Sequence, residues 1–189
     1  STTANIGFDF SMWRGRVQGS LELYQSNTTD LLLADQLPGS IGFDQVTRNV
    51  GETRNRGIEL GVSTVNMNTG SGFRWSTDLQ FTKNNEAIVS LYNGAIDDIG
   101  NRWFIGQPLN SYFDYKKEGI WQLGQEEEAK KYGSSVGQIR VQDNNGRNPD
   151  GSLTGQPDGK ITDADRTLIG SDVPKFSMGL TNRLSYKNI

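Results

Sequence analysis

The sequence of 189 residues contains no cysteine and no histidine. Without cysteine there is no disulfide framework and no thiolate chemistry, and without histidine the commonest general base and metal ligand are missing. No stretch approaches 18 consecutive apolar residues, which excludes a transmembrane helix. The charge is nearly balanced, with 19 basic and 22 acidic residues. This balance argues against a nucleic-acid partner.

Apolar residues make up only 33 % of the chain, whereas glycine reaches 23 residues and aromatic residues 10 %. This composition is typical of β-structure with long polar loops rather than of disorder. The first residues lack the basic and apolar regions of a signal peptide. Both ends of the chain fall within or beside expected strands, so we expect a piece of a larger protein.

Apolar and polar residues alternate strictly in five segments, residues 6–12, 17–24, 58–63, 73–82 and 176–185. Such alternation predicts strands with one apolar and one polar face. Very short connections follow the first and third segments. The second is followed by a longer loop, at about residues 34–47, and the fourth by about 80 residues. Short turns that alternate with long loops are typical of an outer-membrane β-barrel.

The alternation by itself fits two folds. In a β-sandwich the apolar faces of two sheets pack together, whereas in a transmembrane barrel the apolar face meets lipid. Aromatic residues near the short turns, Trp13, Phe73, Trp75 and Tyr186, favour the barrel because they fit an interfacial girdle. The alternative is a secreted β-sandwich that serves in binding or adhesion and carries a calcium-binding loop.

Five strands cannot close a transmembrane barrel, because bacterial single-chain barrels start at eight strands. Open sheet edges in lipid cost several kcal/mol for each unpaired amide. We therefore expect an all-β fold, a segment of an antiparallel transmembrane β-barrel. Barrel strands and short turns are expected in residues 1–84, a long extracellular loop region in residues 85–174 and a last barrel strand in residues 175–189.

Three stretches resemble one family of proteins. "NVGETRNRGIELGV" at residues 49–62, "GQPLNSYFDYKKEGIWQ" at residues 106–122 and "DGKITDADRTLIGSDVPKFSMGLTN" at residues 158–182 are similar to motifs of SusC/RagA-type TonB-dependent transporters. The motifs come in the order of the family. The resemblance spans essentially the whole chain.

The resemblance implies about five strands of a 22-strand barrel in the outer membrane of a Gram-negative, Bacteroidetes-type bacterium. It implies import of glycans or peptides with a SusD-like surface lipoprotein and energy supplied through TonB. The polar face of the strands would line or support the translocation path and contact mainly neighbouring wall or plug residues. Its expected members are Glu59, Asp78, Gln80 and Arg183.

The segment "DNNGRNPDGSLTGQPDGKITDADR", residues 143–166, resembles a calcium-binding loop once residues 147–157 are left out. Such a loop needs oxygen ligands at positions 1, 3, 5, 7, 9 and 12 and glycine at position 6. Gly159 falls at position 6. The expected ligands are Asp143, Asn145, Asp158, Lys160 (through its carbonyl), Thr162 and Asp165. Ca²⁺ is therefore the one cofactor that the sequence suggests.

The same loop has an explanation without a cation. Asp158 and Gly159 then form a turn, and Asp163 or Asp165 caps a short helical turn while it pairs with Arg166. The insertion of 11 residues between positions 4 and 5 is the obstacle to the calcium hypothesis.

The long loop region contains aromatic residues that could contact a glycan or a partner protein, namely Trp103, Tyr112, Tyr115 and Trp121. The alternative explanation, which the sequence favours over glycan contact, is packing of the loop on itself or against a lipoprotein partner. "EEEAKK" at residues 126–131 predicts a short exposed helix, because acidic and basic residues are four apart. No catalytic motif is recognisable, so we expect a protein that is not an enzyme.

Overall fold

The computed structural model describes residues 1–36, 45–92 and 94–187. The chain forms two compact units. The first comprises Ser1–Asn110 and Val173–Ile189, and the second comprises Ser111–Asp172. Across the described residues, no helix is long and apolar enough to span a membrane.

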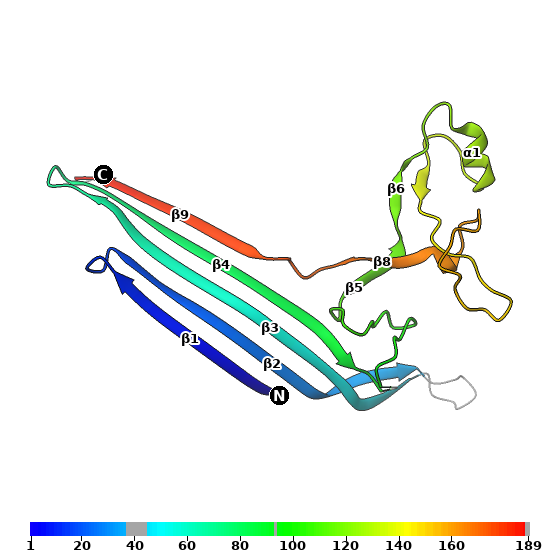
Figure 1. Cartoon of the computed structure of the whole chain (residues 1–189), viewed down its shortest axis with the longest axis horizontal. Coiled ribbons are helices and arrows are strands. Elements are labelled where there is room, and N and C mark those ends of the chain that lie inside the picture. Colours follow the sequence, from blue (N-terminus) through cyan, green and yellow to red (C-terminus); the bar gives the residue numbers. More distant parts are fainter. Residues whose placement is uncertain (37–44, 93, 188–189) are drawn as a thin grey trace. The chain divides into compact units, whose positions relative to one another are not determined.

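The first unit is a five-stranded antiparallel sheet in the order β1-β2-β3-β4-β9. Both short turns and the C-terminal end of β9 lie at the same end of the sheet (Figure 1). Within the described chain, β1 and β9 each pair on one side only, so the sheet has two open edges. The strands are β1 (Thr2–Met12), β2 (Val17–Gln36), β3 (Gln45–Asn68), β4 (Phe73–Ser90) and β9 (Ser177–Tyr186).

Strands β2, β3 and β4 are much longer than the alternation predicts. The expected loop at residues 34–47 is partly strand, because Ala34 pairs with Thr47; residues 37–44 lie outside the described residues. The extra length has no period-2 signal, since "QSNTTD", "ETRNR" and "KNNE" place polar residues on both faces. Strand pairing continues there through the backbone ladder, and polar side chains add bonds across it, such as that from Arg56 Nε to Gln25 Oε1 at 2.8 Å.

The register aligns apolar residues across all five strands in one row and polar residues in the next. One such apolar row is Phe8, Leu21, Leu60, Phe81 and Met178. The apolar face is uncovered, because Ile6 is 74 % and Leu180 61 % exposed. Among its described residues, the first unit has no second sheet that could cover this face, so the β-sandwich alternative is wrong.

A small core lies at the end of β4 that is remote from the short turns. Ile88, Leu91 and Phe104 are buried there. The N–H of Ile88 donates to the carbonyl of Gln107 at 2.9 Å, and the N–H of Gly106 donates to the carbonyl of Ile88 at 2.8 Å. The chain after β4 therefore folds back on the strand, and residues 94–110 belong to the sheet unit.

The second unit contains two small sheets, a helix and a 3-10 helix. β5 (Ser111–Tyr115) pairs with β8 (Arg166–Ser171), and β6 (Lys117–Ile120) pairs with β7 (Ile139–Val141). The predicted helix at residues 126–131 is confirmed as α1 (Glu126–Lys131), with Ala129 fully buried. The 3-10 helix η2 spans Asp163–Asp165.

Candidate functional site

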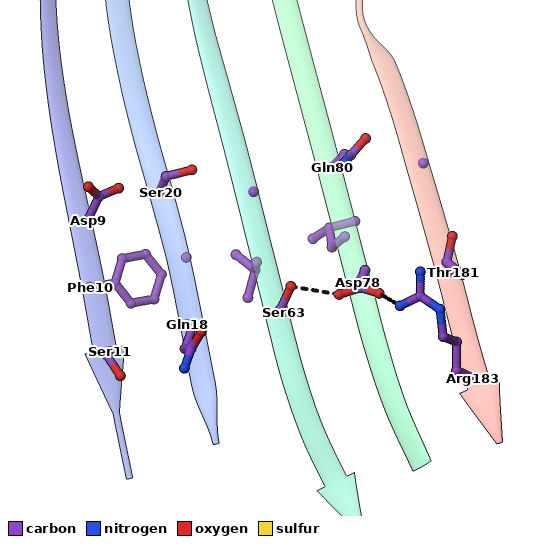
Figure 2. Close-up of a pocket in the computed structure, with 15 residues that line it drawn as sticks. Asp9, Phe10, Ser11, Gln18, Ser20, Ser63, Asp78, Gln80, Thr181 and Arg183 are labelled. Carbon is purple, nitrogen blue, oxygen red and sulfur yellow. Dashed lines mark hydrogen bonds and ion pairs between the residues drawn. The ribbon is translucent and has the colours of Figure 1, made fainter. Parts of the chain in front are cut away.

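The polar face of the five-stranded sheet forms a shallow pocket of about 920 Å³. Every strand contributes, because side chains alternate and the register places polar residues side by side. Figure 2 shows the polar side chains of this pocket: Asp9, Ser11, Gln18, Ser20, Ser63, Asp78, Gln80, Thr181 and Arg183. Three of the four expected lumen residues line it, and Glu59 lies on the same face, opposite Glu22.

Asp78 is the centre of a hydrogen-bonded group that joins three strands (Figure 2). The hydroxyl of Ser63, directly opposite on β3, donates to Asp78 Oδ1 at 2.6 Å. The guanidinium of Arg183 on β9 pairs with Asp78 Oδ2. Arg183 is still 68 % exposed at its side chain, so the ion pair adds little to stability and leaves N–H donors for a further partner. The sequence could not predict this group, because it depends on the register.

Glu22 on β2 and Glu59 on β3 are directly opposite each other on the polar face. Both are exposed, and neither has a basic partner among the described residues. Like charges in this arrangement are destabilising. The face therefore favours contact with cationic groups from outside this sheet.

In the second unit the two halves of the expected calcium loop converge. Gly146 donates its N–H to the carbonyl of Gln156 at 2.9 Å, and Thr154 donates its N–H to the carbonyl of Gly146 at 3.0 Å. Arg147 and Leu153 form an isolated bridge beyond these contacts. Residues 147–157 therefore form a closed hairpin-like loop, and the residues on either side of this loop stay close together.

The side chains expected to ligate calcium accept hydrogen bonds from the backbone. Asp143 accepts the N–H of Asp158 at 3.1 Å and the N–H of Gly159 at 2.7 Å, one on each carboxylate oxygen. Asp158 accepts the N–H of Lys160 at 3.0 Å. Asn145 uses its side-chain oxygen to accept an N–H at 2.9 Å. These bonds organise the loop from both sides of the insertion.

Asp165 is fully buried and holds the loop at both ends. One carboxylate oxygen accepts the N–H groups of Asn144 (2.8 Å) and Asn145 (3.1 Å), and the other accepts that of Thr162 (2.7 Å) in a capping box. Burial alone would raise the pKa of Asp165, but the backbone donors and the Thr162 hydroxyl outweigh it and hold the pKa below its usual value.

The ion pairing expected for this turn is wrong, although the cap is confirmed. Asp163 pairs with Arg147 at 2.9 Å, and the guanidinium of Arg166 lies over the Tyr115 ring at 5.2 Å. Over the parts of the chain that the structure describes, no three acidic side chains gather into a group suited to a metal. Calcium binding through Asp143, Asn145, Asp158, Lys160, Thr162 and Asp165 stays a prediction.

The aromatic residues expected to contact a ligand are divided between the units. Trp103 belongs to the first unit, in a tight turn with Asp98, and is half-buried. In the second unit Tyr112 is 53 % exposed, whereas Trp121 is buried. The Trp121 ring contacts the unit's own Tyr132 and Arg140. Tyr112 is thus the most accessible of the four, and a contact role for them stays a prediction.

A sheet with an uncovered apolar face, a hydrogen-bonded polar face and short turns at one end is a segment of a transmembrane β-barrel wall. The comparison with known proteins agrees with this class. The family model "TonB dependent receptor-like, beta-barrel" matches residues 1–180. The chain therefore belongs to the family of TonB-dependent receptors, and its sheet is an open part of their barrel.

Similar proteins are much longer than this chain. It is 30 % identical to TonB-dependent receptor P3 of Formosa agariphila over all of its residues, which are 19 % of that protein. It is 27 % identical to TonB-dependent receptor SusC of Bacteroides thetaiotaomicron, again over the whole chain and 18 % of the relative. The chain spans about a fifth of the length of these relatives.

Solved structures show the same fold. The RagAB peptide transporter matches with a TM-score of 0.70 at 20 % identity, over 98 % of this chain and 19 % of that one. The RagAB peptide importer in its "open-open" state matches with a TM-score of 0.69 at 23 % identity, over 98 % of this chain and 19 % of that one. These matches confirm the predicted antiparallel barrel fold.

Proposed function

We propose that this chain is part of the wall of an outer-membrane transporter that imports glycans or peptides. The observation that carries the proposal is the division of the sheet into an uncovered apolar face and a hydrogen-bonded polar face. On β4 the apolar face runs from Phe73 to Phe81, nine residues. A tilted transmembrane strand needs about 9–11 residues, so this band has the right height for a bilayer.

Membership of the TonB-dependent receptors supports uptake that is driven through TonB from the inner membrane. The likeness to SusC and to the RagAB transporter supports a SusD-like surface lipoprotein as partner and a Gram-negative outer membrane as location. RagAB is named a peptide transporter, so peptides are a substrate class to test beside glycans. The family consists of transport proteins, which supports transport rather than catalysis.

In this function the polar face lines or supports the path through the barrel. Asp78 and Arg183 hold each other in place, and Arg183 retains donors for a wall, plug or substrate group. The facing carboxylates of Glu22 and Glu59 provide a site for a cationic group. These residues act by binding and positioning.

Uptake by the full-length protein tests the proposal. A strain without the gene, complemented by the wild type or by Asp78→Asn/Arg183→Gln, is given labelled oligosaccharides or peptides. Deletion should abolish uptake of one substrate class, and the double variant should reduce it several-fold at an unchanged amount in the outer membrane. Lys116→Gln, an exposed lysine in the second unit, is the control and should transport normally. Normal uptake of both classes after deletion would contradict the proposal.

A further inference from the structure

The end of the sheet that carries the short turns has charges of one sign. Residues 12–18, 64–77 and 184–187 form this end, and they contain no aspartate and no glutamate. All of their charged residues are basic: Arg14, Arg16, Arg74 and Lys187. The end is therefore positive, in a chain whose net charge is -3.

Two of the four basic side chains have other roles. The guanidinium of Arg16 donates to the carbonyl of Val65 through Nε at 3.2 Å and to the carbonyl of Asn66 through Nη2 at 2.8 Å. It thus satisfies backbone oxygens at the end of β3. Arg74 leaves the sheet on the polar face, since its strand neighbours on either side belong to the apolar face. Neither is directed toward lipid.

Arg14 lies at the tip of the turn between β1 and β2. Trp13 and Arg14 both have left-handed backbone, with φ of 51° and 57°, which is uncommon for residues other than glycine. Trp13 is 69 % exposed. Arg14 is exposed too and makes no hydrogen bond or ion pair with the described residues. The turn therefore presents one large aromatic and one unpaired basic side chain at the rim.

Lys187 lies at the opposite edge of the sheet, directly after β9. Its φ of 53° ends the strand, and its N–H donates to the carbonyl of Gly72 at 2.9 Å. Its ammonium lies over the Tyr186 ring, 5.1 Å from the centroid. Tyr186 is on the apolar face, opposite Phe73. The charge of Lys187 is thus held on the lipid-facing side, at the level of the aromatic girdle.

We propose that the short-turn rim, the surface formed by Trp13, Arg14, Tyr186 and Lys187, binds the phosphate headgroups of anionic phospholipids in the periplasmic leaflet. The inference rests on the proposed function, because the short turns of bacterial barrels face the periplasm. Tryptophan and tyrosine mark the interfacial level, and the two charges lie at that level. Arginine and lysine there are attracted to an anionic leaflet, whereas a zwitterionic headgroup has no net charge.

Lipid retention by the full-length protein tests this inference. The protein is inserted into nanodiscs of equimolar phosphatidylcholine and phosphatidylglycerol with identical acyl chains. The protein is then released from the nanodiscs in the mass spectrometer, and the lipids that remain bound to it are counted by native mass spectrometry. The variant is Arg14→Gln/Lys187→Gln. The control, Lys116→Gln/Lys131→Gln, removes the same charge from exposed lysines of the second unit.

The wild type and the control should retain more phosphatidylglycerol than phosphatidylcholine. In the variant, the ratio of retained phosphatidylglycerol to phosphatidylcholine should fall about five-fold for each charge removed. The preference should also fall as salt is added. Equal retention of the two lipids by the wild type, or the same loss in the control, would overturn the inference and leave the proposed function standing. A protein that does not insert into nanodiscs at all would contradict the proposed function itself.

Discussion

The ring of Tyr24 on β2 lies across the α-carbon of Gly57 on β3. A Cβ at Gly57 would be 2.2 Å from Cζ of Tyr24, and the Tyr24 hydroxyl donates to Asn84 Oδ1 on β4 at 3.2 Å. The three residues form one row of the polar face. One side chain therefore bridges three strands, and only glycine in the middle of the row allows it.

Gly57→Ala should destabilise the barrel because the new methyl group must displace Tyr24 and break its bond to Asn84. The expected cost is about 1–3 kcal/mol of the free energy of unfolding, as for other overpacked sites. Urea unfolding of the full-length protein, followed by the heat-dependent gel mobility of folded barrels, measures it. Gly179→Ala is the matched control on the same face, since nothing lies within 4 Å of its added Cβ. Equal loss in both variants would show that backbone propensity, not Tyr24, is responsible.

Gly19→Ala should be more damaging than Gly57→Ala. Its Cβ would lie 2.6 Å from the backbone carbonyl of Gly61 and 2.5 Å from the Phe10 ring. A ring can rotate, but a carbonyl inside a paired strand cannot move without loss of the register. We expect Gly19→Ala to lower the yield of folded protein in the outer membrane, and Phe10→Ala should not rescue it. Full rescue by Phe10→Ala would show that the ring is the only obstacle.

The barrel strands could be predicted where one face of the strand meets lipid and the other faces the lumen, because apolar and polar residues alternate there. The alternation at residues 73–82 locates β4, but the strand continues to Ser90. Beyond Phe81 both faces carry polar residues, so the period-2 signal ends although backbone pairing continues. The sequence does not predict the register between the strands. The contacts of Asp78 with Ser63 and Arg183 depend on this register, so they could not be predicted either.

The second unit was harder to predict for a different reason. β5 and β8 lie about 50 residues apart in the sequence, and β7 has only three residues, so no local pattern identifies their pairing. The helix at residues 126–131 could be predicted because its charge pattern is local. The sequence predicts the turn near residue 165 and its cap by Asp165, and the structure confirms both. The backbone bonds that bring the two halves of the loop together around residues 147–157 could not be predicted, because they join residues that no local pattern relates.

Asp165 should make the order of this loop depend on acidity. Its folded-state pKa lies below the ordinary value of 3.8, so its stabilising effect is present above that value and is lost as the pH falls through the folded-state pKa. We expect amide-exchange protection of residues 143–165, corrected for intrinsic rates, to be constant from about pH 7 to pH 5 and to fall below about pH 4. Asp165→Asn should weaken protection by about 1–3 kcal/mol at neutral pH and flatten the pH dependence. Unchanged protection in this variant would contradict the role of Asp165.

Calcium binding by the same loop has its own test. If the sequence-based prediction is right, added Ca²⁺ should raise the protection of residues 143–165 in the chelator-treated protein, and Asp143→Asn should abolish the increase. Mg²⁺ should act weakly, because it demands a stricter geometry and gives up water reluctantly. No change with Ca²⁺ in the wild type would mean that the backbone hydrogen bonds alone hold the loop.

The two-faced sheet is the centre of this account, and the absence of cysteine in the chain makes it directly measurable. Single cysteines are placed at Leu79, Gln80 and Phe81 on β4, in a full-length protein free of other cysteines. Intact cells are then treated with a charged maleimide. We expect labelling at Gln80, which lies on the polar face, and protection at Leu79 and Phe81, which lie on the apolar face that meets lipid. Equal labelling at all three positions would contradict a barrel wall.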